Sequence, residues 1–180
     1  IVGLSVAFGT GVLLFLTATF ELSYDRFHTD ADRIFRLYIL SSNRDGSPDK
    51  GSTMPYPISP SLKAEFPEIE GVTRWFDRSA SVRRNEQTYN KDVRMADADF
   101  LQMFSFPLRK GNAKTAMNSL SDIVISDRMA NEIFGSEDPI GKPLQLRLNN
   151  AWQAFTVTGV LSDAPKNSTF EYDALIRSEN

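Results

Sequence analysis

The first twenty residues, Ile1–Phe20, limit what this chain can fold into more than any other stretch. They carry no charged side chain, although 24% of the whole chain is charged. Eleven of the twenty are Ile, Val, Leu or Phe, and the others are Gly, Ala, Ser or Thr. A helix of this length reaches about 30 Å, the thickness of the hydrocarbon core of a bilayer. We therefore predict a transmembrane helix here.

Two alternatives compete for the same segment. A signal peptide would need a basic region before the apolar stretch and a small-residue cleavage site, and neither precedes Glu21. The chain opens on Ile1, however, so an upstream part could supply the basic region, and this alternative stays open. A buried core helix is the second alternative, but such a helix rarely stays uncharged on every face for five turns.

Small residues recur on one face of the predicted helix. Gly3, Ala7 and Gly11 are spaced by four, so they share one side of the helix. Small side chains at this spacing let a second helix approach closely within lipid. We predict that this face packs against another membrane helix.

The residues that follow the apolar segment favour a continuation of the helix. Phe20 and the aromatic residues just after it are spaced as an aromatic belt at the membrane surface would be. We expect the helix to run on through this stretch as a stiff stalk, with the head beginning at residue 29. The predicted stalk residues are Glu21, Tyr24, Arg26 and Phe27.

The remaining 160 residues are enough for one sizeable core or two small subdomains. The chain has a net charge of −3 and no basic tract, which does not suit binding to nucleic acid. It contains no cysteine, which excludes disulfides, thiolate metal sites and cysteine nucleophiles. The absence of cysteine also suits a bacterial extracytoplasmic domain, which need not use disulfides.

Hydrophobic patterning along this head predicts an α+β fold. Alternating or β-branched runs indicate strands, and capped amphipathic runs indicate short helices. The stretch from Ser41 to Tyr56 is polar and predicts a long loop. We expect strands near Ile34–Leu40, Val72–Arg84, Ile123–Ile125 and Leu144–Leu161, and helices near Ser61–Phe66 and Asp127–Phe134.

No group of residues predicts an active site, a cofactor site or a metal site. His28 is the only histidine, and we expect a surface or capping role for it, with pH sensing as a remote option. The loop Gly135–Lys142 has five residues between its glycines and a proline after the lysine, so it does not match a phosphate-binding loop. Asn167–Thr169 matches a glycosylation acceptor, but we expect it to shape a turn.

Several stretches, taken in order, resemble one known family. The apolar segment is followed directly by Glu21–His28 and then by Ala31–Leu37. In this order the stretches are similar to the MacB-like periplasmic core domain of FtsX-like ABC transporter permeases, in the form common in Bacteroidetes-type bacteria. The further matching stretches are Met54–Pro60, Phe66–Thr73, Met103–Leu108, Ile123–Ser126, Phe134–Lys142, Phe155–Val160 and Pro165–Thr169.

This resemblance implies a fold and a location. The family's permeases have four membrane spans, and a large extracytoplasmic domain of mixed α/β character follows the first span. The chain would then divide into a transmembrane helix and stalk at 1–28 and a partial core domain at 29–180. It would lie in the bacterial inner membrane with the domain facing the periplasm. The domain is expected to be incomplete, because the family's chain normally returns to the membrane after it.

The resemblance also implies a function and partners. ATP hydrolysis by a cytoplasmic ABC ATPase subunit would move the spans, and the stalk would carry this motion to the periplasmic domain. The expected partners are that ATPase, a second permease copy, membrane lipid and a periplasmic adaptor, with no nucleic acid. The family's motifs are structural, so we carry over no catalytic residue and expect no cofactor and no enzyme activity in this chain.

Two other functional classes remain open at this point. A membrane-anchored sensor or ligand-binding domain would have the same span and head, but would belong to a longer chain with a signalling module. A membrane-tethered hydrolase would need a buried serine–lysine pair in a cleft, since the chain has no cysteine and only one histidine.

Overall fold

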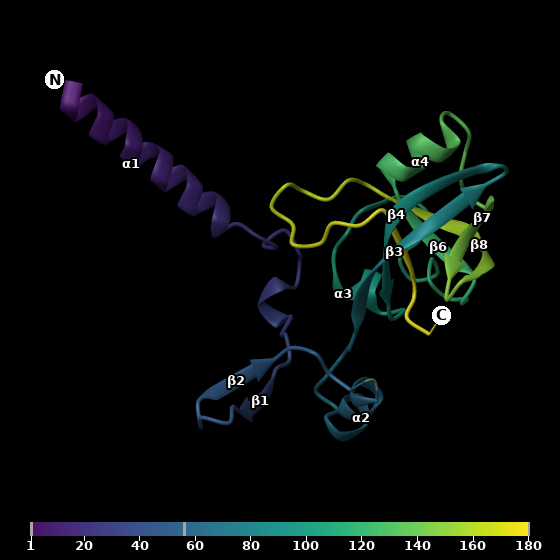
Figure 1. Cartoon of the computed structure of the whole chain (residues 1–180), viewed down its shortest axis with the longest axis horizontal. Coiled ribbons are helices and arrows are strands. Elements are labelled where there is room, and N and C mark those ends of the chain that lie inside the picture. Colours follow the sequence, from purple (N-terminus) through teal and green to yellow (C-terminus); the bar gives the residue numbers. More distant parts are fainter. Residues whose placement is uncertain (1, 56, 180) are drawn as a thin grey trace.

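The computed structural model of the chain describes residues 2–55 and 57–179. Helix α1, Val2–Glu21, projects away from the rest of the molecule (Figure 1), and all its described residues are exposed. It is long and apolar enough to cross a membrane, and none of its apolar window is buried against the protein. The helix is therefore not the core helix of the head.

A closed ring of strands forms most of the head, with the strands hydrogen-bonded in the order β8, β6, β9, β4, β3 and β7 and β7 returning to β8. We call this ring the barrel. The short strand β5, Leu108–Lys110, adds to the outside of β8. The ring strands are β3 (Trp75–Arg84), β4 (Gln87–Ala96), β6 (Asp122–Ser126), β7 (Pro143–Leu148), β8 (Ala151–Leu161) and β9 (Ala174–Arg177).

Two tight turns join neighbouring strands of the barrel. Asn149 and Asn150 both have positive φ, which asparagine tolerates, and they connect β7 to β8 over an unbroken register. Asn85 also has positive φ and lies in the turn between β3 and β4. The predicted hairpin over Leu144–Leu161 is confirmed, and the strand expected near Val72–Arg84 is confirmed as β3, which begins at Trp75.

Two hydrophobic cores lie on the two faces of the sheet. On the central strand β6, Ile123 and Ile125 join one core, while Val124 between them joins the other. This double burial explains the unbroken apolar run that predicted the strand. Helix α4, Asp127–Phe134, packs on the first core with its predicted bounds, and the Ser126 hydroxyl accepts a hydrogen bond from the Met129 amide at its start.

Residues 29–74, which we call the lower lobe, hang below the barrel (Figure 1). The lobe contains η1 (Ala31–Arg33), β1 (Ile39–Ser42), β2 (Pro48–Gly51) and α2 (Ile58–Glu65). The strand expected over Ile34–Leu40 is wrong in its bounds, because only residues from Ile39 onward pair, and they pair with β2. The stretch that was expected to be a long polar loop therefore contains β2 and the last two residues of β1. The helix predicted near Ser61–Phe66 is confirmed and begins earlier, at Ile58.

Candidate functional site: the junction of helix and head

Helix α1 ends at Glu21, and the chain then runs through turns to His28. The predicted continuous helical stalk through Phe27 is therefore wrong. Asp25 adopts a positive φ of 56°, which a right-handed helix cannot contain. Ser23 closes the last turn, with its amide and hydroxyl both donating to the carbonyl of Phe20. The helix stops because the residues after it bond to the head instead.

Asp25 is held by a segment far away in the sequence. Its amide donates to the carbonyl of Asn167 at 2.9 Å, and its carboxylate accepts from the amide of Thr169 at 2.8 Å. The hydroxyl of Thr169 donates to the second carboxylate oxygen. Because a charged acceptor strengthens a hydrogen bond, Asp25 is a firm anchor for the end of the helix.

Asn167 completes this attachment from the other side. Its side-chain amide donates to the carbonyl of Ser23 at 2.9 Å and to the Ser23 hydroxyl at 3.0 Å. The hydrogen bonds between Thr169 and Asp25 accompany this contact. We call these four residues, Ser23, Asp25, Asn167 and Thr169, the clasp. The clasp ties the residues that follow α1 to the loop that leads into β9.

His28 is buried, with 5% of its surface exposed, so the expected surface role is wrong. Its ring lies against Phe27, Phe104 and Phe106, and its Nδ1 atom accepts a hydrogen bond from the Ser105 amide at 3.2 Å. Nε2 is buried without a partner among the described residues. Burial lowers the pKa of His28, although nearby Asp25 acts in the opposite direction. The imidazole is therefore uncharged and fills space in the second core. We call this buried side chain the His28 plug.

The predicted stalk residues take different places. Phe27 packs edge-on against Phe106 at 5.7 Å between ring centroids, so it belongs to the head and not to an aromatic belt. Tyr24 packs against Phe20 at 5.5 Å, beside the end of the helix. Glu21 is the last residue of α1, and Arg26 is exposed in the turn. Whether these residues transmit motion stays a prediction.

The predicted packing face on α1 is open. Gly3, Ala7 and Gly11 are exposed, and a Cβ atom added to either glycine would meet nothing within 4 Å. The hydroxyls of Thr10 and Thr17 donate to carbonyls four residues earlier in the same helix. The hydroxyls of these two threonines are thus satisfied within the helix and do not interrupt its apolar surface. Contact with another helix at this face stays a prediction.

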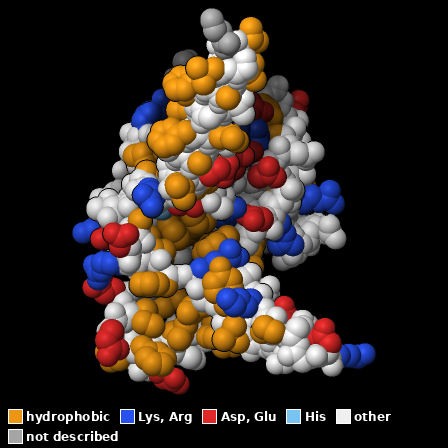
Figure 2. Space-filling view, turned by 90° about the vertical axis from the view of Figure 1, so that its left-hand side faces the viewer, with side chains coloured by type: hydrophobic (Ala, Val, Ile, Leu, Met, Phe, Trp, Pro, Cys, Tyr) orange, Lys and Arg blue, Asp and Glu red, His pale blue; other side chains and the backbone are white. Residues whose placement is uncertain are grey.

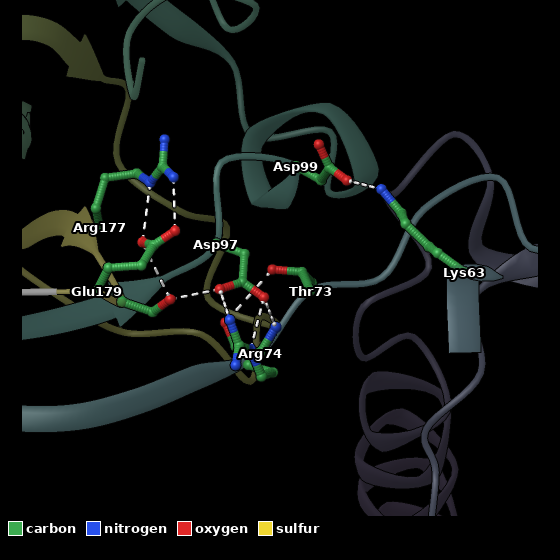
Figure 3. Close-up of polar contacts among 8 residues, drawn as sticks. Lys63, Thr73, Arg74, Asp97, Asp99, Arg177 and Glu179 are labelled. Carbon is green, nitrogen blue, oxygen red and sulfur yellow. Dashed lines mark hydrogen bonds and ion pairs between the residues drawn. The ribbon is translucent and has the colours of Figure 1, made fainter. Parts of the chain in front are cut away.

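A second attachment joins the lower lobe to the barrel (Figure 3). Asp97, just after β4, accepts from the Arg74 amide at 3.0 Å and from two guanidinium nitrogens at 2.9 Å, and it also accepts from the Ser178 hydroxyl. Burial alone would raise the pKa of Asp97, but the hydrogen bonds from Arg74 and Ser178 outweigh it and keep that pKa below its ordinary value. Lys63 of α2 also binds Asp99 at 2.5 Å.

The lower lobe exposes an apolar surface that the barrel does not cover. Figure 2 shows hydrophobic side chains gathered on the lower part of the molecule, below α1. Large apolar side chains of this lobe are between 40% and 82% exposed: Phe35, Leu37, Tyr38, Ile39, Leu40 and Phe66. A contiguous exposed surface of this kind is typical of a contact with another protein or with lipid.

Two kinds of site that could support catalysis are not found among the described residues. No hydrogen bond joins a serine to a lysine in this part of the chain, and no group of three His, Cys, Asp or Glu residues there could hold a metal ion. The loop from Gly135 to Lys142 is fixed by ion pairs, with Glu137 bound to Arg84 and Lys142 and with Asp138 bound to Lys110. The charges of this loop are thus engaged in holding it against the barrel.

Fold and junction together define a class of protein: a β-rich head anchored at the end of an apolar helix that is long enough to span a membrane. Within that class, the chain belongs to the family of the MacB-like periplasmic core domain, which it matches over residues 1–177. The predicted family and the α+β fold are confirmed. The family is a periplasmic domain of ABC transporter permeases. Comparison with curated protein sequences finds no match.

Solved structures share this fold. A domain of a candidate permease protein from Porphyromonas gingivalis is 25% identical, with a TM-score of 0.68 over 86% of this chain and 66% of that one. The periplasmic region of MacB from Actinobacillus actinomycetemcomitans is 18% identical, with a TM-score of 0.51 over 67% and 53%. The extracellular domain of the noncanonical ABC-type transporter YknZ from Gram-positive bacteria is 17% identical, with a TM-score of 0.52 over 67% and 60%. This chain therefore spans less than two thirds of the length of these three structures.

Only part of the clasp could be predicted from the sequence. Asn167–Thr169 was expected to shape a turn, and the Ser168 amide does donate to the carbonyl of Pro165. Asp25 is a residue type that tolerates positive φ, which could have marked a break after the helix. The pairing of these two segments, however, bridges more than 140 positions, which local patterns do not reveal.

Proposed function

We propose that the chain is the extracytoplasmic part of an ABC transporter permease of the export or mechanotransmission type. ATP hydrolysis on a partner subunit moves the membrane helices, and the head moves with them. The chain lies in the bacterial inner membrane with its head in the periplasm. Residues 1–28 serve as the transmembrane helix with its connection to the head, residues 29–180 serve as the core domain, and the chain performs no chemistry of its own.

The clasp is the observation that carries this proposal. A chain that left the membrane through a flexible linker would lose any motion of the helix before it reached the head. Here the first residues after α1 are bound on both sides by Asn167 and Thr169. A few hydrogen bonds and the buried His28 plug thus take over the role that we had assigned to a continuous helix. Rigid-body switching of domains is a common way to use such a connection.

The clasp also directs the motion to a particular element. Residues 167–169 lie shortly before β9, which pairs with both β4 and β6 in the middle of the barrel. A displacement of the end of α1 therefore pulls on the loop that precedes β9, a strand that is buried together with its neighbour β6. Since packed cores deform little, the barrel is expected to move as one body.

Partners follow from the surfaces that the chain leaves open. The cytoplasmic ABC ATPase subunit supplies the energy, and a second permease copy packs against the small-residue face of α1. A periplasmic adaptor is a further partner for the head, membrane lipid surrounds α1, and nucleic acid is not a partner. The family assignment favours this function over a sensor or ligand-binding domain.

The test removes the clasp from a permease assembled with its ATPase. The double substitution Asp25→Ala and Asn167→Ala deletes the side chains that join the two segments. We expect transport to be lost while ATP hydrolysis continues, because the spans still move but no longer move the head. Asp45→Ala is the matched control, since Asp45 also accepts hydrogen bonds from a nearby amide and hydroxyl but lies in the β1–β2 turn.

The outcomes separate coupling from folding. A thermal unfolding scan of each variant shows whether the head remains folded. If the folded double variant transports at the rate of the unsubstituted permease, the clasp does not couple the helix to the head, and the proposal fails. Loss of transport in the Asp45 control to the same extent would also contradict it.

A further inference from the structure

The barrel closes through an incomplete seam. Strands β3 and β7 pair only at Val82–Leu146 and Arg83–Gln145. Continuing this register would place Ser81 opposite Arg147. No further pair forms beyond these two, and an open cleft of about 510 Å³ lies beside the strands, lined by Arg78, Ser79, Ala80, Ser81, Arg147, Asn149 and Asn150.

The short pairing with β7 leaves an unpaired strand edge on β3. Asp92 on β4 lies opposite Ser79. The amide and the carbonyl of Asp92 both form hydrogen bonds with Asp173, on the side of β4 that faces away from β3. Directly opposed residues of an antiparallel pair exchange either both backbone hydrogen bonds or neither. The amide and carbonyl of Ser79 therefore point away from β4, into the seam. By alternation, those of Asp77 and Ser81 do the same.

Of the usual protections, the free edge of β3 has only the charged side chains Asp77 and Arg78. Natural sheets guard an exposed edge by keeping it short or by placing a proline or a bulge there. The other free edge of the sheet fits this rule, because β5 has three residues and an irregular register. Strand β3 has ten residues, no proline and no register shift against β4. Its free edge is thus suited to accept an added strand.

The charges beside the free edge of β3 determine which kind of added strand can bind there. Arg78 and Arg147 line the cleft without any acidic residue. Among residues 2–55 and 57–179, the side chain of Arg147 has no hydrogen-bond or ion-pair partner, and the side chain of Arg78 donates only to the neutral amide oxygen of Asn149 at 2.8 Å. Of the nearby acids, Asp77 pairs with Arg94 and Asp92 accepts from the Ser79 hydroxyl, while Glu171 lines a neighbouring cleft together with Arg78 and Ser79.

We propose that the free edge of β3 binds an extended acidic segment of a partner protein as an added strand. Backbone hydrogen bonds to Ser79 and Ser81 align the segment, and its carboxylates bind Arg78 and Arg147. A carboxylate replaces the neutral Asn149 acceptor at Arg78 with a stronger one. A second copy of this chain fits less well, because it would bring the same two arginines to the seam.

The probe is a pool of dodecapeptides with Glu at every second position and random uncharged residues between. A second pool carries Lys in place of Glu. The full chain, held in detergent micelles on a solid support, is expected to retain the Glu pool about tenfold over the Lys pool. Hydrogen exchange should show that the Glu pool protects the amides of Ser79 and Ser81.

Three variants make the test decisive. The double variant Arg78→Gln and Arg147→Gln should lose the preference for the Glu pool, while Arg44→Gln, an exposed arginine in the β1–β2 turn, should keep it. Ser79→Pro removes an outward amide and should also abolish binding. Equal retention of both pools, or binding that survives either seam variant, overturns the proposal. Hydrogen-exchange protection of the β3 edge that increases with the concentration of the chain, in the absence of peptide, also overturns the proposal. A second copy of the chain would then be the occupant.

Discussion

The barrel and the first part of the chain differ in what holds them in place. Among the described residues, every buried hydrophobic side chain lies between Ala80 and Ile176. Of the described residues in 2–55 and 57–74, only His28 and Ser59 are buried, and both are polar. The barrel is thus stabilised by its own two cores. The first part is positioned by a few polar attachments and by the packing of Phe27 and His28 on the second core, and its exposed apolar surfaces remain available to lipid and to partners.

The largest expected effect separates the two regions directly. Leu146→Ala empties a site in the barrel that has no exposed surface, and it should lower the free energy of unfolding by about 2–5 kcal/mol. Leu40→Ala removes the same atoms from a side chain that is 73% exposed and should change it by less than about 0.5 kcal/mol. Urea unfolding of the full chain in micelles, followed by tryptophan fluorescence, measures both. Similar losses in the two variants would contradict the comparison.

A pair of glycines sharpens the contrast through backbone packing. Gly111 and Gly46 both have positive φ, near 92° and 82°. A Cβ atom at Gly111 would lie 2.5 Å from the carbonyl oxygen of Thr158 in β8, whereas at Gly46 it would meet nothing. Gly46→Ala should cost only the conformational strain, about 1–2 kcal/mol. Gly111→Ala should cost clearly more, because the backbone of the barrel must shift. The same unfolding assay would disprove this if Gly46→Ala were the more damaging.

Two ion pairs at the lobe provide the next comparison. Arg74 and Asp97 are mostly buried, so Asp97→Asn should destabilise the head by about 1–3 kcal/mol. Glu70, which pairs with Arg33 at the surface, is largely exposed, and Glu70→Gln should leave stability unchanged within error. The low pKa of Asp97 predicts that its contribution is present above about pH 3.8 and is lost as the pH falls further. An effect of Glu70→Gln equal to that of Asp97→Asn would refute this.

The smallest effect concerns His28. Burial lowers its pKa in the folded protein, so below about pH 6.5 the unfolded chain binds a proton more readily than the folded one. The contribution of His28 to stability is therefore complete above that pH and is lost as the pH falls through the lowered pKa. His28→Phe keeps an aromatic ring but does not titrate, so its stability should depend less on pH between 7.5 and 5. Identical pH profiles would show that the plug does not titrate as described.

Local signals in the sequence predicted those elements of the fold that local contacts decide. Ser126 caps α4 and Gly135 ends it, as expected from residue type alone. Asn149 and Asn150 likewise determine the β7–β8 turn. The closure of the barrel by β3 and β7 was not predicted, because it joins residues more than 60 positions apart. The bounds of β1 were wrong because the apolar run before Ile39 looks like a buried strand but has no strand beside it.

The junction shows the same limit. The end of the apolar run correctly marked the end of α1, but the aromatic spacing after it suggested a helix that does not form. Phe27 and His28 instead serve the second core, and their partners Phe104 and Phe106 lie far along the chain. A short segment can adopt several conformations, and here tertiary contacts choose among them.

The central claim is that the clasp fixes the head to α1. The chain has no cysteine, so Thr19→Cys on the helix and Thr88→Cys on β4 provide a clean pair of spin-label sites. Pulsed electron paramagnetic resonance in lipid nanodiscs should give one narrow distance distribution. Adding Asp25→Ala and Asn167→Ala should broaden it, while Asp45→Ala should not. A distribution that is already broad with the clasp intact, or that stays narrow without it, would contradict the account.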